Sequence, residues 1–277
     1  MAPHDTDDPD AARFSALDCR GPELGDPEPG GPELRGPDVD EARLHALYAY
    51  PTDLTRPLVR GNAITSLDGG ATTDGTSGGL GGTGDRRLFA LLRELADVIV
   101  VGAGTARAET YGGARMTVAQ RQRRQIRGQR EVPPIALVTR SGMLDRELPV
   151  LTDTEVPPLV LTCSDAAAAA GARLGSAAEV IDCSGADPAA VDLRTALAAL
   201  ADRELPRVLV EGGPSLLGAF IDADLLDELC LTAAPILVGG SAVRIAAGDG
   251  AALTRMHRAH VITDTEGYLY LRYTRTA

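Results

Sequence analysis

The sequence lacks tryptophan, and aromatic residues make up only 3% of its 277 residues. A flat ligand ring would therefore be held mainly by aliphatic side chains and backbone rather than by aromatic stacking. Basic residues are also few, since 27 Lys and Arg stand against 39 Asp and Glu, for a net charge of −12. Because binding to a phosphate backbone needs clustered cations, we expect no nucleic-acid partner.

Paired cysteines and long apolar runs are missing as well. The four cysteines stand singly, with no CxxC pair and no neighbouring histidine, so we expect reduced thiols and no metal site. No apolar run reaches the ~18 residues of a membrane span, and the N-terminus lacks the basic and apolar regions of a secretory signal. We therefore expect a cytoplasmic protein with no membrane association.

Residues 1–39 are rich in Pro, Gly, Asp and Glu and poor in large apolar side chains. Such a segment cannot bury enough surface to offset the ordering of its chain, which predicts a flexible acidic tail. Apolar spacing predicts a short helix over 40–48, ended by Pro51. Residues 40–277 are then expected to form a single domain, and the 44% apolar content is enough for a substantial core.

From residue 58 onward, short apolar segments alternate with segments of helical periodicity. The segments with strand character are 58–65, 96–103, 133–139, 157–163, 178–183, 206–212 and 228–239. Leucine spacing predicts a helix after Thr83, with further helices after Leu193 and Leu217. The arginine-rich segment 117–130 is typical of a solvated helix. Residues 257–276 alternate around an Asp-Thr-Glu-Gly turn and predict a hairpin.

This alternation predicts an α/β fold with a mixed, mainly parallel central sheet, helices on both faces and a C-terminal β-hairpin. Ligands of such folds collect at the carboxyl ends of the parallel strands. The strand ends are therefore the places to look for a site.

One glycine-marked strand end is VIVVGAGTARAE, at residues 98–109. Its glycines would let a cofactor approach the backbone closely. The third glycine of a dinucleotide-binding GxGxxG would, however, fall at Arg107, so the fingerprint is incomplete. A tight strand-to-helix turn with no ligand explains the segment equally well.

A second such strand end is VLVEGGPSLLG, at residues 208–218. Pro214 stands where a first helical turn tolerates a missing N–H. The amides of Gly213, Ser215 and Leu216 would then face a diphosphate at the positive end of the helix. Glu211 would either meet a ligand at the strand end or cap the helix.

The third feature, SLDGG at 66–70, places Asp68 in a turn after a strand that contains Asn62. Asp68 is either an ordinary turn aspartate or a carboxylate that binds the N–H groups of an aminopyrimidine or pterin ring. The glycine-rich run 72–84 is either a mobile flap over a site or a linker. Leu80, within this run, is a candidate lid residue.

Together, SLDGG, ADVIVVGAGTARAE and EGGPSLLGAFIDADLLDELCLTAAPILVGG resemble the pyrimidine reductase family of riboflavin biosynthesis, the reductase half of the bifunctional deaminase-reductase. The resemblance is strongest over 59–109 and 208–240 and runs through most of 58–273. It implies a dihydrofolate-reductase-like fold, NADPH as hydride donor and a homodimer. It also implies reduction of the ribosyl group of a 5-amino-6-(5-phosphoribosylamino)uracil to a ribityl chain.

The resemblance further implies site residues. The substrate side comprises Asn62, Asp68 and Glu211, with Asp68 as the catalytic residue that anchors the substrate and assists protonation through water. The cofactor side comprises Leu80, Gly102, Ala103, Thr105, Glu109, Arg140, Ser141, Gly212, Gly213, Pro214, Ser215 and Leu216. Arg140 and Ser141 follow a strand and suit the 2′-phosphate of NADPH, although a surface ion pair would equally explain Arg140.

Some positions depart from the family pattern. The HxE and PCxxC zinc signature of the deaminase is absent, so we expect no deamination. Asn62 stands where the riboflavin enzymes often carry a lysine, and Glu109 and Thr110 stand where they carry aspartates. These departures leave the substrate open. We expect an NADPH-dependent reductase of a pyrimidine or pteridine, with a dihydrofolate reductase-like activity and NADPH binding without turnover as alternatives.

Overall fold

The computed structural model describes residues 13–16, 38–248, 250 and 253–275. Its strands are β1 (Phe14–Ala16), β2 (Asp38–Val39), β3 (Leu58–Thr65), β4 (Val98–Gly102), β5 (Ile135–Val138), β6 (Leu159–Thr162), β7 (Glu179–Asp182), β8 (Arg207–Val210), β9 (Glu228–Ala233), β10 (Met256–Asp264) and β11 (Leu269–Arg275). Its helices are α1 (Glu41–Tyr48), α2 (Thr83–Leu95), α3 (Ala103–Ala108), α4 (Val118–Ile126), α5 (Pro149–Thr152), α6 (Ser164–Leu174), α7 (Leu193–Ala201) and α8 (Pro214–Asp222), with a 3₁₀ turn at Gly175–Ala177.

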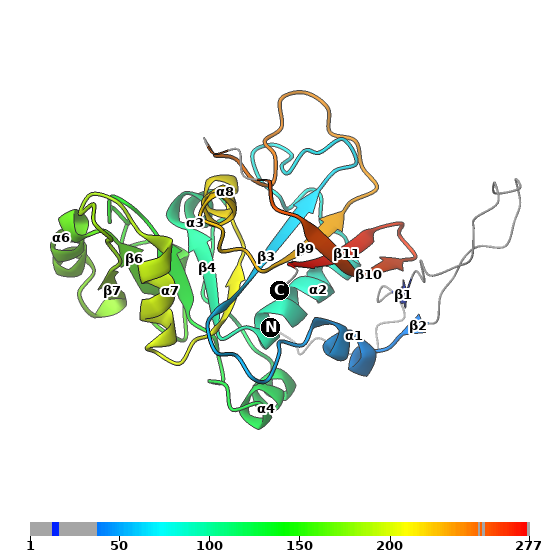
Figure 1. The fold of residues 1–277 in the computed structure, drawn as a ribbon, viewed down its shortest axis with the longest axis horizontal. Helices are drawn as coiled ribbons and strands as arrows, with labels where there is room; N and C mark the ends of the chain where they lie inside the picture. The colour runs from blue at the N-terminus through cyan, green and yellow to red at the C-terminus, as the bar shows by residue number, and fades with distance from the viewer. Residues whose placement is uncertain (1–12, 17–37, 249, 251–252, 276–277) are drawn as a thin grey trace, which may run out of the picture.

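All described strands belong to one sheet, ordered β2-β1-β10-β11-β9-β3-β8-β4-β5-β6-β7 (Figure 1). The strands from β9 to β7 run parallel, whereas β11, β10, β1 and β2 are antiparallel to their neighbours. The predicted mixed, mainly parallel sheet and its C-terminal hairpin are therefore confirmed. Within the described ranges, no helix has the length and apolar character needed to cross a membrane.

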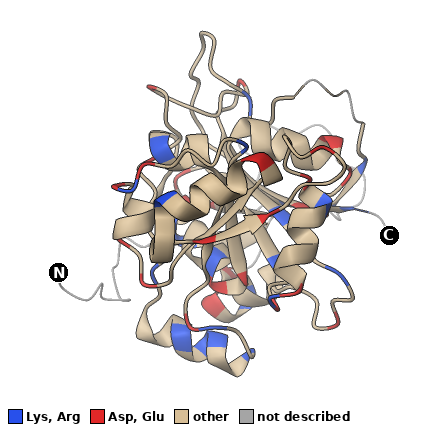
Figure 2. Ribbon diagram, turned by 90° about the vertical axis from the view of Figure 1, so that its left-hand side faces the viewer, with Lys and Arg blue, Asp and Glu red and all other residues tan. Residues whose placement is uncertain are grey.

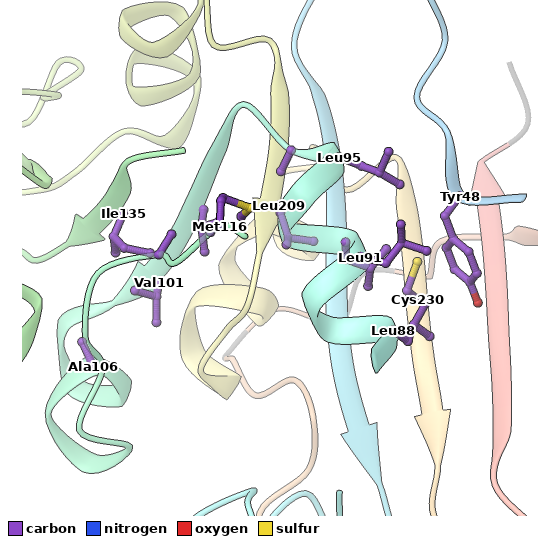
Figure 3. Close-up of a cluster of buried hydrophobic side chains, with 14 of the residues drawn as sticks. Tyr48, Leu88, Leu91, Leu95, Val101, Ala106, Met116, Ile135, Leu209 and Cys230 are labelled. Atoms are coloured by element: carbon purple, nitrogen blue, oxygen red, sulfur yellow. The ribbon is translucent and has the colours of Figure 1, made fainter. Parts of the chain in front are cut away.

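Helices cover the two faces of the sheet with separate apolar cores. On one face, the predicted leucine stripe of α2 (Leu88, Leu91, Leu92 and Leu95) is buried against α1 and the sheet (Figure 3). On the other face, the buried side chains of α7 and α8 pack on the valines of β3, β4 and β8. Each fully buried leucine contributes about 1.5–3 kcal/mol, so the stripe alone explains why α2 forms where its period predicts it.

The start of α2 docks on the β10–β11 hairpin through a glycine. A Cβ at Gly84 would overlap the Tyr270 hydroxyl and would lie 2.6 Å from Oδ2 of Asp264. That carboxylate accepts a hydrogen bond from the Tyr270 hydroxyl at 2.6 Å. The absence of a side chain therefore lets the first turn of α2 approach the hairpin closely, which fixes where its neighbouring residues point.

The strand predicted over 228–239 is shorter than expected. β9 ends at Ala233. Pro235 follows two residues later, and it has no backbone N–H to donate to a neighbouring strand. The chain from there bonds instead to the turn after β3, with the Leu67 amide donating to the Ile236 carbonyl at 2.9 Å. The second half of the apolar run is thus a loop that lies beside SLDGG.

The segment predicted as an acidic tail contains two short strands. Phe14 in β1 is 1% exposed and packs edge-to-face on Tyr270, with 5.2 Å between the two ring centroids. β1 pairs with both β10 and β2. The expectation of a flexible tail over 1–39 therefore does not hold for 14–16 and 38–39, because the buried Phe14 side chain and strand pairing on both sides hold β1 in the sheet. The rest of that expectation, over 1–12 and 17–37, lies outside the described residues.

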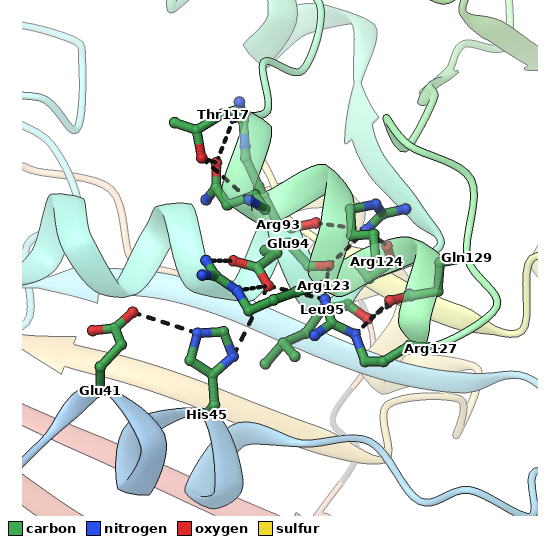
Figure 4. Close-up of polar contacts among 12 residues, drawn as sticks. Glu41, His45, Arg93, Glu94, Leu95, Thr117, Arg123, Arg124, Arg127 and Gln129 are labelled. Carbon is green, nitrogen blue, oxygen red and sulfur yellow. Dashed lines mark hydrogen bonds and ion pairs between the residues drawn. The ribbon is translucent and has the colours of Figure 1, made fainter. Parts of the chain in front are cut away.

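The arginine-rich segment forms the helix α4, but its charges are only partly solvated. Arg124 is 0% exposed and donates to the carbonyls of Glu94 at 2.7 Å and Ala96 at 2.6 Å, at the end of α2. Arg123 and Arg127 both bond the buried Glu94 carboxylate (Figure 4). Figure 2 shows the basic residues gathered on α4, with acidic residues close by. These arginines fasten α4 to α2, which explains the run without a nucleic-acid role.

The three described cysteines, Cys163, Cys183 and Cys230, are buried free thiols, and Cys19 lies outside the described residues. Burial raises the pKa of Cys183 and of Cys230 to about 11, so both remain protonated at neutral pH. They behave as core side chains rather than as reactive groups.

Candidate active site

A cavity of about 520 Å³ lies at the carboxyl ends of the parallel strands, bounded by α2, α3 and α8. From β3 the chain crosses through α2 to β4, beyond β8, whereas from β8 it crosses through α8 to β9, beyond β3. The connections therefore leave in opposite directions, which opens a crevice at the edge of the sheet. The size and position are those of a small-molecule site.

The cavity brings together seven of the residues that the sequence predicts for the site. They are Asn62, Thr105, Glu109, Glu211, Gly212, Gly213 and Pro214. They come from β3, α3 and the start of α8. Both glycine-marked strand ends, and the strand before SLDGG, therefore line the same cavity. The sequence predicts this arrangement, because the motifs follow parallel strands whose carboxyl ends share one edge of the sheet.

The backbone at the start of α8 is open toward the cavity. Gly212 has a φ of +93°, and a Cβ built on it would meet nothing within 4 Å. Its carbonyl accepts from the Gly102 amide at 2.8 Å, which ties α8 to the end of β4. A Cβ at Gly213 would overlap the Thr105 hydroxyl, so α3 and α8 begin in close contact. The N-terminus of α8 and bare glycine backbone therefore face the cavity, with Thr105 of α3 beside them, an arrangement suited to a diphosphate.

Other predicted cofactor residues have different surroundings. The Leu216 amide donates to the Gly213 carbonyl at 3.0 Å, so it is used inside the helix and not presented to a ligand. Ser215 is exposed, and Ala103 is buried in the core. Gly102 acts through its backbone, as the residue that precedes α3.

Arg140 and Ser141 are exposed after β5 and lie outside the cavity wall, as does Leu80. Leu80 is 0% exposed, and its carbonyl accepts from the Tyr268 hydroxyl at 3.0 Å. The expectation of Leu80 as a lid residue therefore does not fit the structure, because this leucine is held in the core under the glycine-rich run. That run is instead fastened to α3, since Glu109 accepts a hydrogen bond from the Ser77 amide at 2.8 Å.

Glu211 forms a closed ionic group at the base of the cavity. Its carboxylate is 1% exposed and accepts two hydrogen bonds from Arg93, at 2.8 and 2.7 Å, and one from the Tyr111 hydroxyl at 2.7 Å. The Arg93 guanidinium also lies over the Phe89 ring, 4.2 Å from its centroid. Glu211 thus caps no helix. It lies on the cavity wall, held by Arg93 and Tyr111, and its contact with a ligand stays a prediction.

Burial and charge set the protonation of this group. Burial alone would lower the pKa of Arg93, but the adjacent Glu211 carboxylate and Tyr111 hold it above its usual range. Burial, followed by the Glu211 charge, raises the pKa of Tyr111 well above 10.0, so the phenol stays a donor. The sequence alone did not point to Arg93 or Tyr111. Arg93 lies on a leucine-rich helix and Tyr111 in a loop, and neither position by itself indicates a site.

Asp68 is exposed and lies outside the cavity wall. It accepts from the Ser66 hydroxyl at 2.5 Å and from the amides of Val238 at 3.1 Å and Gly239 at 2.6 Å. The Ser66 hydroxyl and these amides lower the pKa of Asp68 to about 2. The structure therefore assigns Asp68 to the ordinary alternative, a turn aspartate, which here holds the loop after β9; it does not support the role of catalytic substrate anchor.

Asp85 and Arg86, which the sequence reading did not place in the site, lie on the cavity wall. Asp85 is half-buried in the first turn of α2, and its side chain hydrogen-bonds Thr232 of β9. Burial raises the pKa of Asp85 above 3.8. The available signal was an acidic residue in a first helical turn directly after a glycine-rich run. Among the described residues, no group of three metal-ligating side chains is placed to hold an ion.

Known proteins resemble this chain over most of its described residues. The model of the RibD C-terminal domain matches residues 57–270. A 2,5-diamino-6-ribosylamino-4(3H)-pyrimidinone 5′-phosphate reductase of Methanothermobacter thermautotrophicus is 31% identical over 196 residues, covering 70% of this chain and 86% of that protein. The riboflavin biosynthesis protein RibD of Mycobacterium tuberculosis is 30% identical over 190 residues, but the chain spans only 44% of its length.

Solved structures agree. A pyrimidine reductase-like protein from Corynebacterium diphtheriae superposes with a TM-score of 0.69 at 30% identity, over 80% of this chain and 92% of that one. The riboflavin biosynthesis reductase Rib7 of Saccharomyces cerevisiae shares the fold, with a TM-score of 0.60 at 17% identity, over 83% of this chain and 97% of that one.

Proposed function

This chain belongs to the RibD C-terminal domain family, and on that premise we propose that it is a nicotinamide-dependent reductase of a phosphorylated ribosylaminopyrimidine. The observation that supports this most directly is the cavity at the β3 and β8 strand ends, where bare glycine backbone and the N-terminus of α8 meet Thr105 of α3. The archaeal relative, matched over most of its length, is named as a reductase of such a substrate.

NADPH is the proposed cofactor, and the residues present suit it. The open backbone at Gly212 leaves space where any other residue would place a side chain, and Gly213 and Ser215 begin α8 beside it. These amides, with the Thr105 hydroxyl at the start of α3, would hold the diphosphate. When bound, NADPH supplies a hydride. Arg140 and Ser141, at the end of the neighbouring strand β5, stay candidates for its 2′-phosphate.

The substrate would lie toward α2 and β3. Arg86 is the cationic side chain on the cavity wall among the described residues, and it suits the substrate phosphate. Asn62 stands on β3 with its side chain at the same cavity, where an amide offers both a donor and an acceptor to a ring edge. Glu211, closed by Arg93 and Tyr111, would give this end a fixed floor rather than a direct contact.

The relatives' names favour this reading over dihydrofolate reduction and over binding without turnover. A homodimer and a cytoplasmic location stay predictions, and the first is open to sedimentation analysis of the purified chain. Absence of deaminase activity likewise stays a prediction, open to an ammonia-release assay.

The deciding experiment titrates NADPH into the purified protein by its fluorescence, which no tryptophan obscures, and then follows its oxidation with substrate. The substrates are the diaminopyrimidinone phosphate, the corresponding aminouracil phosphate and dihydrofolate. We expect binding, and oxidation with at least one pyrimidine. A Thr105→Val variant, which removes the hydroxyl proposed to hold the diphosphate and keeps the side-chain shape, should weaken cofactor binding while keeping its fold by circular dichroism. Binding with no oxidation by any pyrimidine would overturn the proposal.

A further inference from the structure

The glycine-rich run 72–84 forms one side of the cavity. Its residues on the cavity wall include Gly75, Ser77, Gly78 and Gly81. Just before the run, the Ala71 amide donates to the Val243 carbonyl at 2.8 Å. Farther along, the carbonyl of the buried Leu80 accepts a hydrogen bond from the Tyr268 hydroxyl at 3.0 Å. The chain is therefore fixed at these two points, and the residues between them span one side of the cavity.

Between these anchors the run makes most of its contacts with itself. Thr73 and Thr76 exchange backbone hydrogen bonds of 2.8 and 3.0 Å. Cβ atoms built on Gly75 and Gly78 would meet nothing within 4 Å, so there is open space beside them. Among the described residues, a single hydrogen bond joins 72–79 to another segment, from the Ser77 amide to Oε1 of Glu109 at 2.8 Å. The middle of the run therefore depends on this bond for its position.

Glu109 is itself held at the end of α3. Its amide donates to the Thr105 carbonyl at 2.9 Å, one turn earlier, and both residues lie on the cavity wall. The Thr105 hydroxyl lies against Gly213 at the start of α8, where the proposed cofactor site begins. This short helix therefore carries a proposed cofactor contact near its start and the acceptor for the glycine-rich run at its end.

From these contacts we propose that Glu109 is a positioning residue, which holds the glycine-rich run over the cavity as a strap that must detach before a ligand can enter or leave. The ligand is the nicotinamide cofactor of the proposed function, on which this inference rests. Detachment breaks one hydrogen bond and needs no unfolding, because both anchors stay in place and the glycines have wide backbone freedom. Glu109 then sets how long the cofactor stays bound.

Two substitutions separate the reach of Glu109 from its charge. Glu109→Gln keeps an acceptor oxygen at the same reach without the charge, whereas Glu109→Asp keeps the charge on a side chain one methylene shorter. Stopped-flow fluorescence of NADPH, chased with excess NADP⁺, measures the dissociation rate. We expect Glu109→Asp to raise that rate about tenfold, the effect of losing one hydrogen bond, and Glu109→Gln to raise it less than about threefold. Asp74→Asn is the control and should leave the rate unchanged, because Asp74 is exposed on the run and outside the cavity wall.

The association rate distinguishes a strap from a direct contact. Releasing a strap speeds entry as well as exit, so in Glu109→Asp the Kd of NADPH should rise by less than the dissociation rate. A side chain that itself binds the cofactor would raise both equally and leave the association rate unchanged. That second pattern, or an unchanged dissociation rate in Glu109→Asp, would overturn the inference.

Amide exchange in the free protein tests the strap without any ligand. By NMR, the Ser77 amide should exchange about tenfold faster in Glu109→Asp and at nearly the wild-type rate in Glu109→Gln. The Thr76 amide, whose partner Thr73 lies inside the run, should be unaffected in both. Equal protection of Ser77 in Glu109→Asp and in the wild-type protein would contradict the inference. If NADPH does not bind at all, the proposed function fails in its cofactor, and the exchange of Ser77 still decides whether Glu109 holds the run.

Discussion

The Arg93–Glu211–Tyr111 group at the floor of the cavity gives the most demanding prediction. In Arg93→Met the Glu211 carboxylate, 1% exposed, would lose two hydrogen bonds of 2.8 and 2.7 Å and keep only that from Tyr111. Leaving a buried charge without its counter-ion costs about 3–5 kcal/mol. Because Arg93 is 18% exposed and water can partly replace it, we expect the lower end, about 3 kcal/mol.

Urea unfolding followed by circular dichroism measures this loss, since the chain has no tryptophan to report by fluorescence. A companion variant, Tyr111→Phe, removes one hydrogen bond to a charged group and should cost about 1.5–3 kcal/mol. In a Glu211→Met background, Arg93→Met should cost less by at least about 1 kcal/mol, since no carboxylate is then left unpaired. NADPH affinity should fall with Arg93→Met too, because Glu211 directly precedes the Gly212 backbone.

The matched control is Arg121→Met, whose partner Glu155 lies on the surface with 43% of its side chain exposed. Pairs of this kind contribute at most about 1 kcal/mol. If Arg93→Met costs no more than Arg121→Met, the Glu211 group is not the closed ionic floor described here, and its role would have to be sought in direct contact with a ligand.

Three further predictions test other parts of the molecule. In Gly218→Ala the new Cβ would lie 2.7 Å from the carbonyl carbon of Ala247, which is backbone and cannot turn aside, so urea unfolding should show a loss of about 1–3 kcal/mol. Gly171→Ala, in a helix with open space around it, should instead gain up to about 1 kcal/mol, and equal effects of the two would contradict the packing of α8. Arg124→Met leaves the last carbonyls of α2 without their donor and should lower the unfolding free energy by about 2–4 kcal/mol; a loss below about 1 kcal/mol would show that water replaces the guanidinium. The pKa of Asp68 falls from 3.8 to about 2 on folding, so its stabilisation is present above pH 4 and disappears as the pH drops toward 2. Asp68→Asn should therefore flatten the acid-side decline of stability in that window, and an unchanged slope would argue against the loop contact.

Much of the fold could be predicted from the sequence because its signals are local. The run 58–65 coincides with β3, and the leucine stripe of α2 is buried where its period predicts. The glycine-marked strand ends meet at one cavity because parallel strands place their carboxyl ends on one edge of the sheet. The same local signals failed where a neighbour decides, as for 234–239, which is a loop held beside SLDGG although its composition is that of a strand.

The sequence by itself therefore determined the α/β class, most of the elements and the place of the site. The tertiary structure decided which acidic residue has which surroundings. Asp68 accepts hydrogen bonds from amides 170 and 171 positions further along the chain. Glu211 accepts them from an arginine 118 positions before it, and Asp85 lies on the cavity wall. The physical reason is that a carboxylate's role depends on its burial and on the donors around it, and those donors come from segments that only the folded sheet brings together.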